Sequence, residues 1–117
     1  MKKVLIAGLF TAVALCAILV HADDKKFTGQ IMDSQCAFLG GHSAMMNKDM
    51  PTEKACTLGC VKEGGMFVLY DPMEKKTYQL DDQKKPEQFA ADMVVVTGTY
   101  DESSQTIHVT DIEAAKK

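Results

Sequence analysis

The sequence MVVVTGTYDESSQTIHVTDI, residues 93–112, predicts two β-strands joined by a turn. Residues 93–100 are rich in the β-branched side chains that strands favour. The acidic and serine residues at 101–104 are typical of a turn, and residues 105–112 alternate between apolar and polar side chains. We therefore expect the chain to end in a β-hairpin.

Three more strands are expected upstream of this hairpin. Residues 66–70 (MFVLY) are apolar on both faces, which indicates a strand that is central in a sheet or covered on both sides. Asp71-Pro72 suits the start of a turn, and residues 77–81 would form the partner strand. Residues 27–32 alternate as a first strand.

Two helical segments are predicted between these strands. Pro51 suits the first turn of a helix and Gly64-Gly65 suits its end, so residues 51–62 are expected to be helical. A second, short helix is expected at residues 86–91, before the fourth strand. Residues 33–49 show no regular pattern and are expected to form a loop.

This order of elements predicts a mainly β fold, a small five-stranded OB-like barrel. One helix would lie between the first two strands, and a short one before the fourth. Gly29 and Gly98 lie within strands, where a tightly coiled barrel needs residues without a Cβ atom. The alternative is an open five-stranded sheet with one helix packed across it.

The N-terminus predicts export. Met1-Lys2-Lys3 is a short basic segment, residues 4–20 are apolar, and Val20-His21-Ala22 matches a signal-peptidase site. We expect a signal peptide at residues 1–22 and a single OB-like domain at 23–117, periplasmic or extracellular and free of the membrane after cleavage. An uncleaved membrane anchor is the alternative, although the apolar run is at the short limit for one.

Composition disfavours a nucleic-acid partner. The 117 residues contain 13 lysines, no arginine and 16 acidic residues, for a net charge of −3. Nucleic-acid-binding proteins usually present a basic face and read guanine and phosphate with arginine. The sequence also contains no phosphate-binding loop, dinucleotide fingerprint or nucleophilic-serine motif.

Cys36, His42, Cys56 and Cys60 lie within 25 residues, and we call them the Cys–His cluster. Cys56 and Cys60 are four residues apart, so they lie on one side of the predicted helix. Gly59 beside them would let another segment approach closely, and the loop that carries Cys36 and His42 is the expected one. Asp33, just before the cluster, is a candidate partner for a ligating histidine.

Three interpretations of the Cys–His cluster remain open. In the first, a structural disulfide joins Cys36 to Cys56 or Cys60, and one thiol is left for a partner, a metal or a covalent dimer. In the second, all four residues bind one metal ion: zinc, or copper if the nearby methionines 45, 46 and 50 contribute. In the third, the cluster is a thiol redox site, although C-x3-C lacks the usual C-x-x-C spacing.

The motif around the cluster resembles a family of small exported bacterial proteins of unknown function. Asp33-Ser34-Gln35-Cys36, then His42 and Cys56-x3-Cys60, carry the resemblance, and residues 67–70, 77–80 and 94–99 extend it. The resemblance implies a compact, OB-like exported domain, and because the histidine accompanies the cysteines it favours a metal or ligand role. We expect a binding or interaction module with an unknown ligand, monomeric or thiol-linked, rather than an enzyme. The alternative is a soft-metal protein of the cell envelope.

Overall fold

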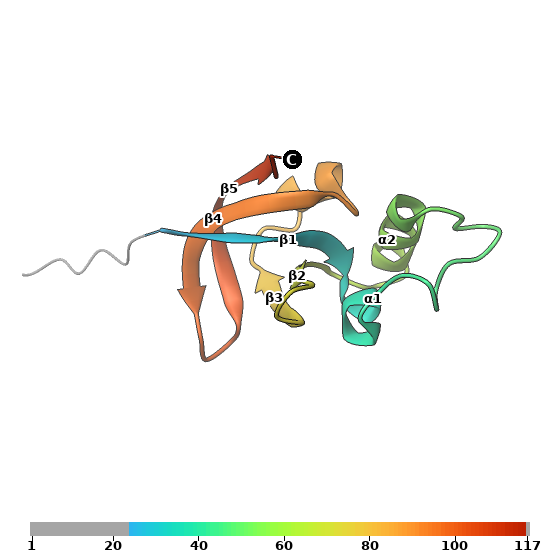
Figure 1. Ribbon diagram of the computed structural model, residues 1–117, viewed down its shortest axis with the longest axis horizontal. Helices are drawn as coiled ribbons and strands as arrows, with labels where there is room; N and C mark the ends of the chain where they lie inside the picture. The colour runs from blue at the N-terminus through green and yellow to red at the C-terminus, as the bar shows by residue number, and fades with distance from the viewer. Residues whose placement is uncertain (1–23, 117) are drawn as a thin grey trace, which may run out of the picture.

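The computed structural model describes residues 24–116 (Figure 1). The predicted signal peptide, residues 1–22, lies outside this part. Within residues 24–116, no helix is long and apolar enough to cross a membrane. The elements, in chain order, are β1 (Lys25–Asp33), α1 (Ser34–Leu39), α2 (Glu53–Lys62), β2 (Phe67–Asp71), β3 (Lys76–Leu80), the 3₁₀ helix η1 (Lys85–Phe89), β4 (Met93–Asp101) and β5 (Thr106–Ala114).

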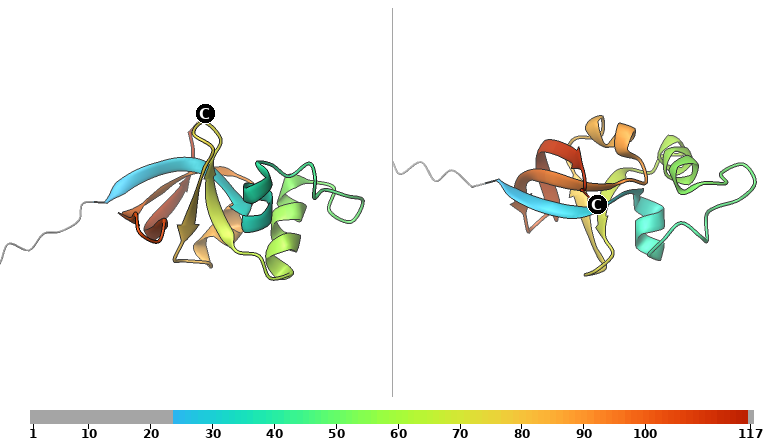
Figure 2. Two further views of the ribbon diagram at one scale, coloured as in Figure 1. Left: turned by 90° about the horizontal axis from the view of Figure 1, so that it is seen from below. Right: turned by 45° about the horizontal axis from the view of Figure 1, so that its top comes forward.

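The described residues are mainly β, as predicted, and their five strands form one mixed sheet that closes into a ring. The strand order is β1-β2-β3-β5-β4, and β4 pairs back onto β1. Among the pairs in this ring, β3 and β5 run parallel, through Gln79 opposite Thr106 and Leu80 opposite Ile107. Figures 1 and 2 show α1 and α2 together at one end of the ring.

Two glycines allow the strands of the ring to approach one another closely, as predicted. A Cβ atom at Gly29 would lie 2.5 Å from the carbonyl oxygen of Tyr70 on β2. A Cβ atom at Gly98 would collide with the carbonyl oxygen of His108, beside the register shift between β4 and β5. Backbone atoms cannot move aside as flexible side chains can, so both positions need glycine.

The prediction of one helix between the first two strands is wrong, because the structure has both α1 and α2 there. The side chain of Asp33 caps α1, and Gly40 ends it in the left-handed conformation with φ of 78°. The second helix begins later than predicted. Thr52 caps it by accepting a hydrogen bond from the backbone N–H of Ala55, so Pro51 precedes the cap.

Two apolar cores share strands β1 and β2. The first fills the ring and contains Ile31, Phe67, Leu69, Tyr78, Leu80, Ala90, Val94, Val96, Ile107 and Ile112. The second lies where α1 and α2 meet the outer face of the ring and contains Met32, Cys36, Ala37, Cys56, Cys60, Val68 and Tyr70. Since consecutive residues of a strand face opposite sides, β2 contributes to both cores. This explains why its sequence is apolar on both faces.

Asp81 is expected to make the fold sensitive to acid. Its carboxylate accepts a hydrogen bond from the backbone N–H of Val109 at 2.8 Å and lies 3.1 Å from Nδ1 of His108. These contacts lower the pKa of Asp81 below its usual value of 3.8, and the hydrogen bond from the Val109 N–H has the largest effect. The stabilisation is therefore present above pH 3.8 and is lost as the pH falls through the lowered pKa.

Urea denaturation between pH 2 and pH 6 tests this expectation. We expect Asp81→Asn to remove part of the loss of stability below pH 3.8. His108→Ala should retain most of the acid sensitivity, because it leaves the Val109 contact in place. If Asp81→Asn and the parent lose stability in parallel as the pH falls, the carboxylate has no such role.

Candidate functional site

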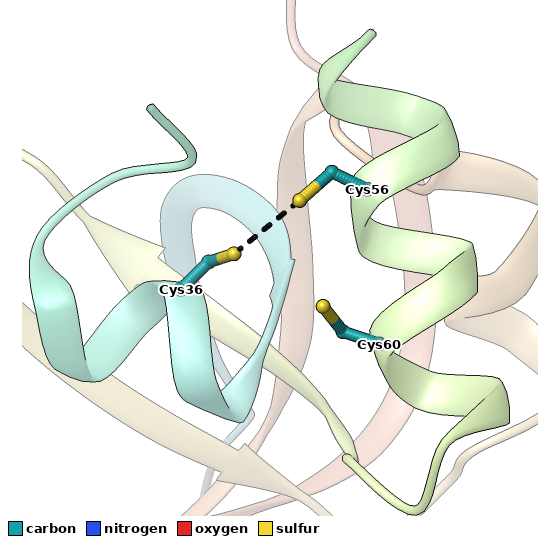
Figure 3. Close-up of side chains that lie close together, drawn as sticks. All are labelled: Cys36, Cys56 and Cys60. Carbon is teal, nitrogen blue, oxygen red and sulfur yellow. Dashed lines mark hydrogen bonds between the residues drawn. The ribbon is translucent and has the colours of Figure 1, made fainter. Parts of the chain in front are cut away.

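The two helices at the end of the ring bring three cysteine sulfurs together. Cys36 lies on α1, and Cys56 and Cys60 lie one turn apart on α2, as their spacing predicts. Figure 3 shows the three side chains pointing into the space between the helices. Their sulfur atoms all lie within 4.8 Å of one another. We call these residues the thiol triad.

The thiol triad is buried and contains no sulfur–sulfur bond. Cys36 and Cys56 are 0% exposed and Cys60 is 4% exposed. The sulfurs of Cys36 and Cys56 are 3.7 Å apart, whereas a disulfide bond is about 2.05 Å long. None of the three is joined to another by a disulfide bond, so the disulfide of the first interpretation is not formed in residues 24–116.

His42 lies beside the triad on the loop between α1 and α2. Its side chain is buried, with 4% exposure, and lies within 4.8 Å of the sulfur of Cys36 and a carboxylate oxygen of Asp33. Neither ring nitrogen has a hydrogen-bond partner among the residues that the structure describes. Cys36 thus belongs to two groups of donor atoms, the thiol triad and a group with Asp33 and His42.

Asp33 ends β1 and is completely buried. Its Oδ2 atom accepts hydrogen bonds from the backbone N–H groups of Gln35 at 3.1 Å and Cys36 at 3.0 Å. Its Oδ1 atom has no hydrogen-bond partner within residues 24–116. The position of Asp33 in the sequence made it a candidate partner for the histidine. The sequence did not predict the helix that Asp33 caps, so it did not predict that one carboxylate oxygen serves as the cap.

The loop from α1 to α2 is packed against α2 at Gly59. A Cβ atom there would lie 2.6 Å from the thioether sulfur of Met50, so glycine makes room for that side chain. This is the close approach of the loop that the sequence predicted. The partly buried methionines at positions 45, 46 and 50 all pack against the second core, which contains the thiol triad.

Burial disfavours the thiolate forms of Cys36 and Cys60. It raises the pKa of Cys60 to about 11 and also raises the pKa of Cys36. The nearby Asp33 carboxylate adds to both shifts, because a negative charge disfavours a thiolate. An anionic sulfur in this site therefore needs a positive charge close by, and a metal ion supplies one.

Cys36, His42 and Asp33 also have the composition of a nucleophile, a base and an orienting acid. A nucleophilic cysteine, however, needs an accessible thiolate with a lowered pKa. Cys36 is completely buried and its pKa is raised. The site therefore suits a bound ion better than attack on a substrate.

Comparisons of the chain with protein-family models, with curated proteins and with solved structures found no match. The functional interpretation therefore rests on the chemistry of the residues themselves.

Proposed function

We propose that this protein binds one thiophilic metal ion, Zn²⁺ or Cu(I), through Cys36, His42, Cys56 and Cys60. The observation that carries the proposal is that three buried thiols lie together and that one of them, Cys36, also lies within 4.8 Å of a buried imidazole whose two nitrogens lack hydrogen-bond partners in the described chain. Three cysteines and one histidine are an established ligand set for zinc.

The spacing of two of the sulfur atoms fits such an ion. Zinc–sulfur bonds are about 2.3 Å long, so two sulfurs of a tetrahedral site lie about 3.8 Å apart. The sulfurs of Cys36 and Cys56 are 3.7 Å apart. Leaving a buried polar group without a partner costs about 1–3 kcal/mol, and ligation would satisfy one nitrogen of His42.

Two soft metals suit the site for different reasons. Zinc prefers four ligands, and His42 would complete the thiol triad. Cu(I) prefers sulfur donors, and the partly buried methionines at positions 45, 46 and 50 pack soft thioether side chains against the core that contains the thiol triad. Parallel titrations with Zn²⁺ and with Cu(I) under reducing conditions distinguish these ions.

The setting that we propose is a small exported domain with an OB-like barrel. Five strands, ring closure and the parallel β3–β5 pair support this assignment. The predicted signal peptide supports export to the periplasm or beyond. Because all three thiols of the triad are buried, we expect a monomer rather than a thiol-linked dimer. Any partner is then a protein or small ligand that the metal-bound domain contacts.

A titration of the reduced protein with a chromophoric chelator as competitor tests the proposal. We expect one ion per chain, and we expect His42→Ala to lower the affinity by more than tenfold. His108→Ala is the matched control, because that histidine is exposed on β5 and should leave the affinity unchanged. If His42→Ala binds as tightly as the parent, His42 is not a ligand. If the parent binds neither Zn²⁺ nor Cu(I), the proposed function is wrong.

A further inference from the structure

We infer that Asp33 is a positioning residue for His42, with its two carboxylate oxygens serving two different partners. This inference rests on the proposed function. One oxygen caps α1, and the other would accept the N–H of the imidazole whose second nitrogen binds the metal. The same side chain would thus hold the helix that carries Cys36 and the histidine that approaches it.

The first oxygen is already in use. Oδ2 accepts two backbone N–H groups at the start of α1, one of them from Cys36 itself. This arrangement fixes the carboxylate at the end of β1, three residues before the first ligand. Because the carboxylate is held by backbone groups, its second oxygen has a defined position.

Among residues 24–116, the second oxygen of Asp33 lacks a hydrogen-bond donor, and the imidazole of His42 lacks an acceptor. Oδ1 of Asp33 is buried without a donor, and His42 is buried without an acceptor, within the structure's described residues. A ring nitrogen of His42 and a carboxylate oxygen of Asp33 already lie within 4.8 Å of each other and of the sulfur of Cys36. A rotation of the imidazole that brought one ring N–H to Oδ1 of Asp33 would satisfy both groups.

Metal ligation would make His42 the hydrogen-bond donor and Asp33 the acceptor in this pair. A histidine that binds a metal is neutral, so one nitrogen faces the ion and the other carries a hydrogen. A carboxylate that accepts this hydrogen fixes the tautomer and the ring orientation, and it makes the imidazole a better ligand. Asp33 is suitably placed for this task, while its charge is also compensated by the two N–H groups of α1.

Two substitutions separate this role from helix capping. Asparagine and serine cap helices about as well as aspartate, so Asp33→Asn and Asp33→Ser should keep α1 and the urea midpoint of the metal-free protein close to those of the parent. Both variants leave His42 without a carboxylate oxygen that could accept its N–H. We expect the Zn²⁺ affinity of each variant to fall by about 10–100-fold, the usual cost of losing such a partner.

Asp101→Asn is the matched control. Asp101 also accepts a backbone N–H, from Ser103 at 2.9 Å, but it is the last residue of β4, where the exposed turn to β5 begins. We expect the Zn²⁺ affinity of Asp101→Asn to equal that of the parent. Nitrogen–hydrogen NMR of His42 adds a readout that capping does not affect: the ring N–H should exchange slowly with water in the zinc-loaded parent and faster in Asp33→Asn.

The outcomes distinguish this inference from the proposed function. If the parent binds one ion and both Asp33 variants bind equally tightly with unchanged exchange of the His42 N–H, the inference is wrong and the metal site stands. If the parent binds two ions, Asp33 is itself a ligand with Cys36 and His42, which also overturns the positioning role. If the parent binds no ion, the proposed function and the inference both fail.

Discussion

Saturation with zinc is expected to raise the free energy of unfolding of the reduced protein by about 4 kcal/mol when free zinc exceeds its dissociation constant about 1,000-fold. The reason is that the ion would bind donors that only the folded chain brings together. Cys36 comes from α1, His42 from the following loop, and Cys56 and Cys60 from α2. An unfolded chain has no such preformed site.

Thermal melting with zinc and with chelator measures this effect. For a domain of this size, each 1 kcal/mol shifts the melting temperature by about 4–8 °C, so we expect a rise of about 15–30 °C. Cys60→Ser is the control, because it removes one sulfur from the slightly exposed side of the triad. Its melting temperature should respond far less to zinc. An equal response of the parent and Cys60→Ser would contradict the assignment of the triad as ligands.

Gly98→Ala is expected to destabilise the protein by about 3 kcal/mol or more, the upper end of the usual cost of overpacking. The new methyl group would meet the carbonyl oxygen of His108, with the side chain of Ile107 at 3.0 Å on the same side. β4 and β5 would have to separate, and β5 is the strand that closes the ring onto β3.

Gly41→Ala is the matched control for Gly98→Ala. A Cβ atom at Gly41 would meet nothing within 4 Å, so we expect a change within about 0.5 kcal/mol. Urea denaturation of the metal-free, reduced proteins measures both effects. If Gly98→Ala unfolds at the same urea concentration as the parent, the close approach of the two strands is wrong.

The strands could be predicted from the sequence because burial leaves a direct pattern in it. Residues 93–100 are rich in β-branched side chains, and residues 66–70 are apolar on both faces because two cores cover β2. The ring closure was expected from the strand count and the two glycines. The parallel pairing of β3 with β5 was not predicted, because it rests on only two residue pairs far apart in the sequence.

The first helix was missed because it is only six residues long and its sequence, SQCAFL, has no apolar periodicity. Its two end signals were present, since Asp33 is a preferred N-terminal cap and Gly40 a preferred C-terminal one. The lack of a regular pattern over residues 33–49 instead predicts a loop. A search for capping pairs, rather than for periodicity, would have found this helix.

Most of the candidate site could be predicted from residue types and spacing. The separation of Cys56 and Cys60 placed them on one side of a helix, and Gly59 predicted the approach of the loop. The depth of burial of Asp33 and His42 could not be predicted, because polar residues are usually exposed and nothing local marks an exception. That burial gives the strongest support for a metal site.

An intact mass measured under native conditions tests the central claim most directly. The protein would be purified from its own cells without chelator or reductant, so that the cysteines keep the state they have there. We predict a fully reduced chain that carries the mass of one zinc or copper ion. A chain that is two hydrogens lighter and carries no metal would contradict the claim, because it would show that the thiol triad forms a disulfide instead.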